Sequence, residues 1–82
     1  MSVFEKQSIP EVILVKPKRF GDDRGYFSET FRENLFSDAG IVGPFIQDNH
    51  SLSTQAGVIR GLHFQTHPSP QAKLVRCTRG RI

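Results

Sequence analysis

The chain has 82 residues, of which 37% are hydrophobic, and its formal net charge is +3. A chain of this length forms one small domain at most and buries roughly 60–65% of its unfolded surface, so its core is marginal. A single cysteine excludes an internal disulfide, and no Cys and His residues stand at zinc-finger spacing. No segment has the pattern of a secretory signal, and we therefore expect a cytoplasmic protein.

The charge is distributed unevenly along the chain. Residues 1–48 contain six Lys or Arg and all eight Asp or Glu, whereas residues 49–82 contain five Lys or Arg and no acidic residue. A cationic half favours an anionic ligand such as a phosphate, a nucleic acid or a nucleotide sugar. The alternative is that neutralising carboxylates lie in further sequence, and the two interpretations are compatible.

Three local patterns follow one another in the first part of the chain. The β-branched run "EVILVK" (residues 11–16) predicts a first strand. The Gly and Asp residues of "FGDDRG" (residues 20–25) predict a turn. "YFSETF" (residues 26–31) alternates as a strand does, which places Tyr26 and Phe27 on opposite faces.

A short helix is predicted for "RENLFSDAG" (residues 32–40). Phe31, Leu35 and Ala39 follow each other at intervals of four residues, so they would form one apolar stripe. Gly40 is placed to end this helix.

The second part of the chain alternates strand patterns with turns. We expect strands at "FIQDNHSLS" (residues 45–53), "VIRGLHFQ" (residues 58–65) and "AKLVRCT" (residues 72–78). Short strands with frequent turns and one small helix predict an all-β fold, either an antiparallel sandwich or a barrel. Such folds usually need more strands than these, so we expect residues 1–82 to be the N-terminal portion of a single domain.

Arg60, Gly61 and His63 are unusual in the apolar segment "GVIRGLHFQ" (residues 57–65). Burying Arg or His is costly, and glycine weakens a strand unless the backbone does something unusual. In a regular strand Arg60 and His63 would point to opposite faces, whereas a bulge at or near Gly61 would bring both onto one face. The alternative is close strand packing at Gly61, with His63 as a hydrogen-bonded core residue.

Four segments occur in a fixed order: "FGDDRGYFSETF", "FIQDNHSLS", "GVIRGLHFQ" and "QAKLVRC". Together they resemble the dTDP-4-dehydrorhamnose 3,5-epimerase family. The resemblance runs from about Ile9 to the last residue and corresponds to the N-terminal part of a family member. It implies a cupin-type jelly-roll β-barrel. The implied reaction converts dTDP-4-dehydro-6-deoxy-D-glucose to dTDP-4-dehydro-L-rhamnose in dTDP-L-rhamnose biosynthesis.

The resemblance implies that six polar residues bind the substrate. Those of "DDRGYFSE" would contact the nucleotide end, and those of "QDN" would supply further polar contacts. The arginine of "GVIRGLHFQ" would contact the diphosphate, because its fork matches phosphate oxygens bidentately. These residues are Arg24, Glu29, Gln47, Asp48, Asn49 and Arg60. The alternative for each is an ordinary solvated charge or a polar residue at a strand edge.

The resemblance also implies that His63 and Lys73 are catalytic. Inverting C3 and C5 beside a 4-keto group needs a base, and neutral histidine suits that step. Deprotonation places negative charge on the keto oxygen, where the ammonium of Lys73 would stabilise the enolate. No cofactor and no metal are implied.

The acid side of this reaction is not found in the sequence. The resemblance places the proton-donating tyrosine and the carboxylate that orients the base histidine later than residue 82. The only tyrosine here, Tyr26, lies in a different motif. We therefore expect the chain alone to be inactive.

Several other functions remain open. A metal-binding cupin would need His-x-His followed by Glu, whereas three residues separate His63 from His67 and no acidic residue follows Asp48. A nucleic-acid-binding module would use the basic second half, but no recognition motif is present and the seven Phe fall at core-facing spacings. An inactive fragment, a sugar-nucleotide-binding relative, and a related dTDP-keto-sugar mono-epimerase or ketoisomerase are further alternatives. The resemblance also implies a homodimer, and we expect no nucleic-acid or membrane partner.

Overall fold

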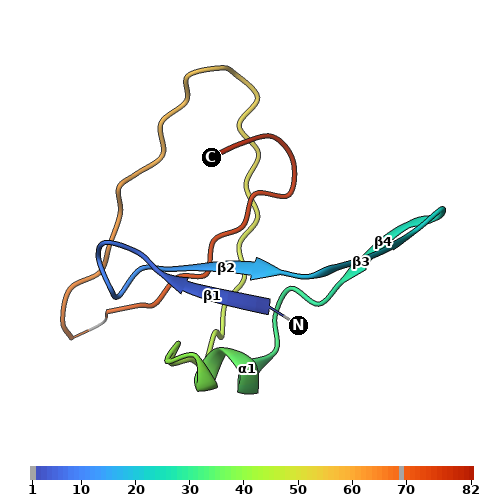
Figure 1. Ribbon diagram of the computed structural model, residues 1–82. Coiled ribbons are helices and arrows are strands. Elements are labelled where there is room, and N and C mark those ends of the chain that lie inside the picture. Colours follow the sequence, from blue (N-terminus) through green and yellow to red (C-terminus); the bar gives the residue numbers. More distant parts are fainter. Residues whose placement is uncertain (1, 69) are drawn as a thin grey trace. The chain divides into compact units, whose positions relative to one another are not determined.

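The computed structural model describes residues 2–68 and 70–82. The chain divides into two compact units, Met1–Val42 and Gly43–Ile82. Regular structure in the described residues lies in the first unit and is mostly strand, with one short helix (Figure 1). This content agrees with the predicted all-β class. In the described part of the chain, no helix is long and apolar enough to cross a membrane.

The first hairpin pairs β1 (Ser2–Lys6) with β2 (Ile13–Pro17) in an antiparallel arrangement. Lys16 Nζ donates to Glu5 Oε1 at 2.9 Å across the two strands. An exposed ion pair of this kind contributes at most about 1 kcal/mol, so the hairpin depends mainly on its apolar face. β2 confirms the strand predicted at residues 11–16, whereas β1 has no counterpart among the predicted strands.

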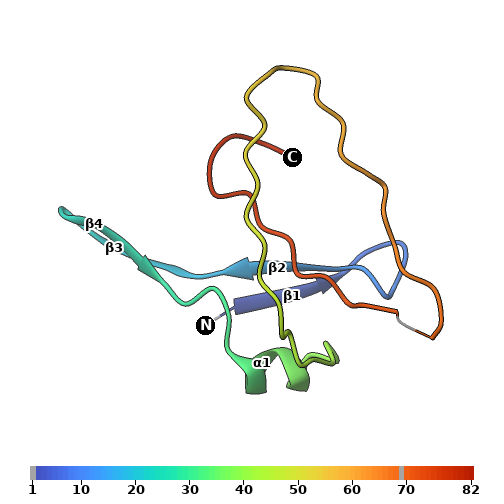
Figure 2. The same cartoon turned by 180° about the vertical axis from the view of Figure 1, so that it is seen from behind.

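The second hairpin pairs β3 (Arg19–Asp22) with β4 (Gly25–Ser28). Its turn lies at residues 23–24, which confirms a turn within the predicted residues 20–25, although residues 20–22 and 25 belong to the two strands. Gly25 has a φ of +132°, a backbone conformation that residues with a Cβ rarely adopt. Both ribbon views show this hairpin extending away from β1 and β2 (Figure 1 and Figure 2).

The helix α1 (Glu33–Asp38) confirms the predicted helix and ends in a Schellman motif. Gly40 has a φ of +85°, and its N–H donates to the carbonyl of Ser37 at 3.0 Å. The N–H of Ile41 donates to the carbonyl of Phe36 at 2.9 Å. Gly40 therefore ends the helix as predicted, because glycine adopts this φ without strain.

Phe36 is the one fully buried hydrophobic residue among those described, with 2% of its surface exposed. Its ring lies edge-on to Phe4, with 5.1 Å between centroids, and at 4.7 Å from the ring of Phe31. The helix is thereby packed against β1. Of the predicted stripe, Leu35 and Ala39 are half-buried, whereas Phe31 precedes the helix. The central core residue is Phe36, which the predicted stripe does not include.

The second unit contains no helix or strand among the residues that the structure describes. The strands predicted at residues 45–53, 58–65 and 72–78 are therefore wrong for this chain. An alternating sequence favours an extended backbone, but a strand also requires ladder hydrogen bonds to a neighbouring strand. The described residues of this unit form no such ladder. The alternating sequence indicates which side chains would share a face, but it does not determine which strand, if any, lies beside the segment.

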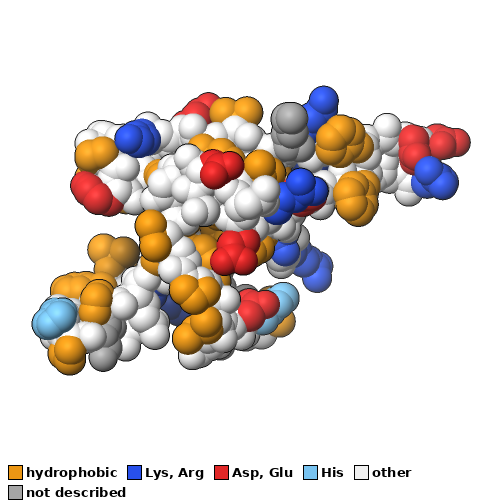
Figure 3. Space-filling model, turned by 90° about the horizontal axis from the view of Figure 1, so that it is seen from below, with side chains coloured by type: hydrophobic (Ala, Val, Ile, Leu, Met, Phe, Trp, Pro, Cys, Tyr) orange, Lys and Arg blue, Asp and Glu red, His pale blue; other side chains and the backbone are white. Residues whose placement is uncertain are grey.

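Large hydrophobic side chains are exposed in both units. Phe27 is 73% exposed and Phe64 is 80% exposed. Figure 3 shows hydrophobic side chains on the surface in view. The prediction that the phenylalanines face a core is therefore wrong for Phe20, Phe27 and Phe64.

Candidate functional site

Arg24 and Asp22 form an ion pair at the tip of the second hairpin. Arg24 Nη2 donates to Asp22 Oδ2 at 2.6 Å, and the backbone N–H of Arg24 donates to Oδ1 at 2.9 Å. The side-chain hydrogen bond, supported by the backbone one, lowers the pKa of Asp22. The same side-chain bond raises the pKa of Arg24. Both residues are exposed, so the arginine predicted to bind substrate is anchored by its own turn and faces solvent.

Glu29 lies between β4 and α1 and is half-buried. Arg32 Nη2 donates to Glu29 Oε2 at 2.8 Å. This carboxylate is therefore already paired with a cation three residues away. A ligand that contacts the Glu29 carboxylate would therefore share this carboxylate with Arg32.

Gln47, Asp48 and Asn49 lie in an exposed segment of the second unit. Gln47 Nε2 donates to Asn49 Oδ1 at 3.4 Å, a long and weak hydrogen bond. The two amides are thus close to each other, as residues at positions i and i+2 of an extended segment are. Asp48 has no side-chain partner among the described residues.

The guanidinium group of Arg60 is bound to the segment that precedes it. Nε donates to Ser53 Oγ at 3.0 Å, and Nη2 donates to the carbonyl of Leu52 at 3.1 Å. Between these residues the chain turns at Gly57, which has a φ of +78°. Arg60 therefore closes the loop of residues 53–60 with its side chain.

Gly61 has a φ of +123°, so the backbone departs from strand geometry at the position where a bulge was expected. A Cβ built on Gly61 would lie 3.6 Å from the backbone nitrogen of His63 and 3.9 Å from its Nδ1. A side chain at position 61 would therefore contact the imidazole of His63. With no ladder in this segment, a common strand face for Arg60 and His63 stays a prediction.

Lys73 and His63, the two residues predicted to be catalytic, are held together. Lys73 Nζ donates to the backbone carbonyl of His63 at 2.9 Å, although ten residues separate them in sequence. Both side chains are exposed. One of the three N–H groups of the ammonium is therefore bonded to the backbone of the residue that carries the proposed base.

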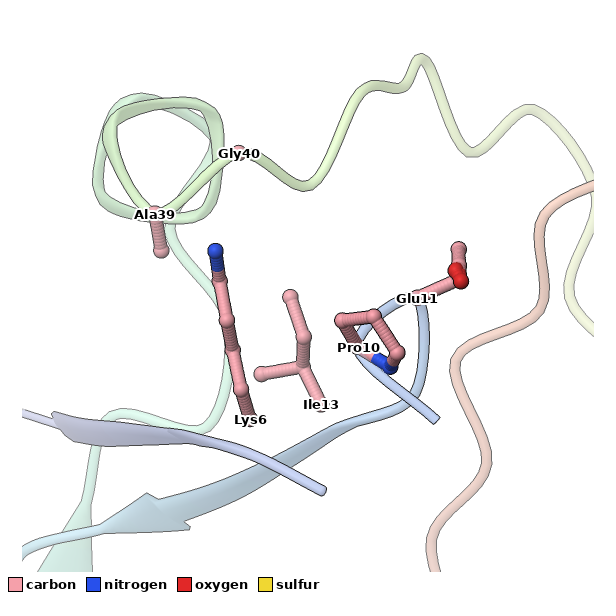
Figure 4. Close-up of a pocket in the computed structure, with 6 residues that line it drawn as sticks. All are labelled: Lys6, Pro10, Glu11, Ile13, Ala39 and Gly40. Carbon is pink, nitrogen blue, oxygen red and sulfur yellow. The ribbon is translucent and has the colours of Figure 1, made fainter. Parts of the chain in front are cut away.

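A surface hollow of about 360 Å³ lies in the first unit, beside the first hairpin and the end of α1 (Figure 4). It contains none of the predicted site residues, being lined by Lys6, Pro10, Glu11, Ile13, Ala39 and Gly40. In Figure 4 the Lys6 side chain extends toward Ala39 and occupies part of the space. Across the described ranges, no group of three or more His, Cys, Asp and Glu side chains gathers as metal ligands would.

Sequence reasoning missed two kinds of partner in these clusters. The pairing of Asp22 with Arg24 could have been predicted from local sequence. In an Asx turn, the side chain of an aspartate accepts a hydrogen bond from the backbone N–H two residues later, as Asp22 does from Arg24. Ser53 and the carbonyl of Leu52 had none, because nothing in the spacing indicates that Arg60 folds back onto them. The pairing of Lys73 with the His63 backbone was equally invisible.

A family model described as dTDP-4-dehydrorhamnose 3,5-epimerase matches residues 6–82. The chain belongs to the dTDP-4-dehydrorhamnose 3,5-epimerase family. The match covers all four segments that carry the resemblance, and with them Arg24, Arg60, His63 and Lys73.

Three relatives that carry the name dTDP-4-dehydrorhamnose 3,5-epimerase illustrate the similarity. The protein of Sinorhizobium fredii is 57% identical over 96% of this chain and 40% of its own length. That of Shigella flexneri is 51% identical over 94% of this chain and 42% of its own length. That of Methanothermobacter thermautotrophicus is 49% identical over 96% and 42%, respectively. The chain thus spans about two fifths of the length of these epimerases.

Proposed function

We propose that the complete protein containing this chain is a dTDP-4-dehydrorhamnose 3,5-epimerase. It converts dTDP-4-dehydro-6-deoxy-D-glucose to dTDP-4-dehydro-L-rhamnose by removing and re-adding the protons at C3 and C5, without a cofactor. Membership of the family supports this activity. The structural observation that carries it is the 2.9 Å hydrogen bond that holds Lys73 Nζ next to His63.

In this proposal His63 is the base and Lys73 stabilises the enolate. The C3 and C5 protons are acidic because the neighbouring C4 carbonyl accepts the charge left by their removal. In the proposed reaction, the ammonium group of Lys73 stabilises the negative charge that develops on the keto oxygen. Since Lys73 uses one N–H on the His63 carbonyl, two N–H groups remain for the substrate.

Six polar residues bind the substrate in this proposal. Arg60 contacts the diphosphate, and the cationic second half of the chain supports attraction of this dianion. The remaining five are Arg24, Glu29, Gln47, Asp48 and Asn49.

We further propose a cupin-type jelly-roll barrel to which residues 1–82 contribute the N-terminal portion, in a cytoplasmic homodimer. The strand-rich first unit supports this fold. The exposed hydrophobic side chains support it as well, because further strands or a second copy would bury them.

Replacement of the base tests the proposed function. In the complete protein, His63→Asn should lower turnover about 10²–10⁴-fold, because it removes the proton acceptor. Affinity for dTDP should stay within threefold, because asparagine adds no charge. Turnover is followed in D₂O by NMR, which reports deuterium at C3 and C5 separately.

His67→Asn is the matched control and should leave turnover unchanged, since His67 lies outside the predicted site. A His63→Asn protein with a normal rate would contradict the assignment of the base. Exchange at C3 alone or C5 alone in the unmodified protein would identify a mono-epimerase instead.

A further inference from the structure

The side chain of Arg60 is held by two acceptors on one edge of its guanidinium group. Nε donates to Ser53 Oγ at 3.0 Å, and Nη2 donates to the carbonyl of Leu52 at 3.1 Å. The group carries five N–H donors in a rigid plane, so three remain. They are both N–H groups of Nη1 and the second N–H of Nη2.

The three remaining donors include a complete fork. One N–H of Nη1 and the second N–H of Nη2 point in parallel from the end of the group, which is the arrangement that binds two phosphate oxygens at once. A free arginine side chain would have to lose rotamer freedom to present this fork. Arg60 has lost part of that freedom before any ligand arrives, because Ser53 and Leu52 hold its opposite edge.

We propose that Ser53 is a positioning residue that orients Arg60 toward the diphosphate of the nucleotide sugar. This inference rests on the proposed function, in which Arg60 contacts the diphosphate. Ser53 does not touch the ligand and acts through Arg60. The Leu52 carbonyl takes part in the same arrangement, but only the serine hydroxyl can be removed by substitution.

Affinity for dTDP and for thymidine tests this proposal in the complete protein. Ser53→Ala should weaken dTDP binding about three- to tenfold, the cost of immobilising one long side chain that is no longer held in place beforehand. Thymidine binding should stay within twofold, because thymidine has no phosphate for Arg60 to contact. Ser53→Thr keeps the hydroxyl and should restore dTDP affinity. Thr54→Ala is the matched control, since Thr54 is adjacent and makes no hydrogen bond among the described residues.

A double-mutant cycle separates positioning from loop damage. Arg60→Ala should weaken dTDP binding at least tenfold while sparing thymidine, and adding Ser53→Ala should then change nothing further. One contrary result is that Ser53→Ala weakens dTDP and thymidine binding equally, and another is that it weakens dTDP binding as much in the Arg60→Ala protein as in the unmodified one. Either result would overturn the role of Ser53 and leave the diphosphate contact of Arg60 standing. Unchanged dTDP affinity in Arg60→Ala would overturn the diphosphate contact itself, and this inference with it.

Discussion

The backbone conformation at position 61 explains why a glycine stands there, close to Arg60 and His63. Its φ of +123° is accessible to glycine and strained for residues with a Cβ. A Cβ at this position would also lie within van der Waals contact of the His63 ring, 3.9 Å from its Nδ1. Glycine is a weak strand former, but at this position it allows a backbone conformation that would be strained in other residues.

Asp22 offers a prediction about pH at the residue scale. Its pKa is lowered in the folded chain by the hydrogen bonds from Arg24. A carboxyl with a lowered pKa stabilises the fold above its unfolded pKa, and this contribution is lost as the pH falls through the folded value. Carboxyl NMR titration of Arg24→Gln should show the Asp22 pKa moving up toward that of an isolated aspartate.

Arg19→Gln provides the control for that titration. Arg19 lies over the ring of Tyr26, with its Cζ 4.4 Å from the ring centroid, and makes no hydrogen bond to Asp22. The pKa of Asp22 should therefore stay lowered in this variant. An equal rise in both variants would show that the overall charge of the hairpin, rather than the Arg24 hydrogen bonds, sets the pKa.

At the scale of elements, the first unit is assembled around one aromatic contact. β1 and β2 pair with Phe4 opposite Val15, and Phe36 brings α1 onto this hairpin through the Phe4 ring. A six-residue helix has little stability of its own. Its persistence here depends on the burial of Phe36 and on the Schellman motif at Gly40.

Phe36→Ala should therefore cost more stability than any other single phenylalanine substitution in the first unit. Truncating a buried phenylalanine typically lowers the free energy of unfolding by about 3–5 kcal/mol. Urea denaturation of the complete protein measures the loss, and hydrogen exchange at the amides of Gly40 and Ile41 reports the helix end. Phe27→Ala is the matched control, because Phe27 is exposed and its truncation should cost about 0.5 kcal/mol or less. Similar losses in both variants would show that Phe36 does not anchor the helix.

At the scale of the whole molecule, we expect residues 1–82 alone to be unable to epimerise. The chain supplies the proposed base, but inversion requires a proton delivered to the opposite face of the sugar. Its only tyrosine, Tyr26, lies in β4 beneath Arg19, within the second hairpin.

The test incubates the 82-residue chain with the 4-keto-6-deoxy sugar nucleotide in D₂O. NMR should show no L-sugar product, whereas the complete protein under the same conditions should form it. Deuterium at both C3 and C5 together with product from the 82-residue chain would show that no further donor is required.

The sequence alone determined those features of the protein that depend on residues close to one another in the chain. The strand at residues 11–16, the turn before Gly25 and the helix that ends at Gly40 were predictable, because each depends on dihedral preferences and hydrogen bonds within a few residues. Family membership was predictable for a different reason, since four segments in a fixed order identify it without any knowledge of their pairing.

Tertiary structure decided what depends on partners distant in sequence. The alternation in residues 45–53, 58–65 and 72–78 could indicate faces, yet a strand forms only where a neighbour supplies a ladder. The burial of Phe36, the attachment of Arg60 to Ser53 and the placement of Lys73 on His63 were likewise invisible. Each depends on which groups the folded backbone brings within hydrogen-bond or van der Waals distance. These contacts form between segments that are distant in sequence, so the pattern within one segment does not reveal them.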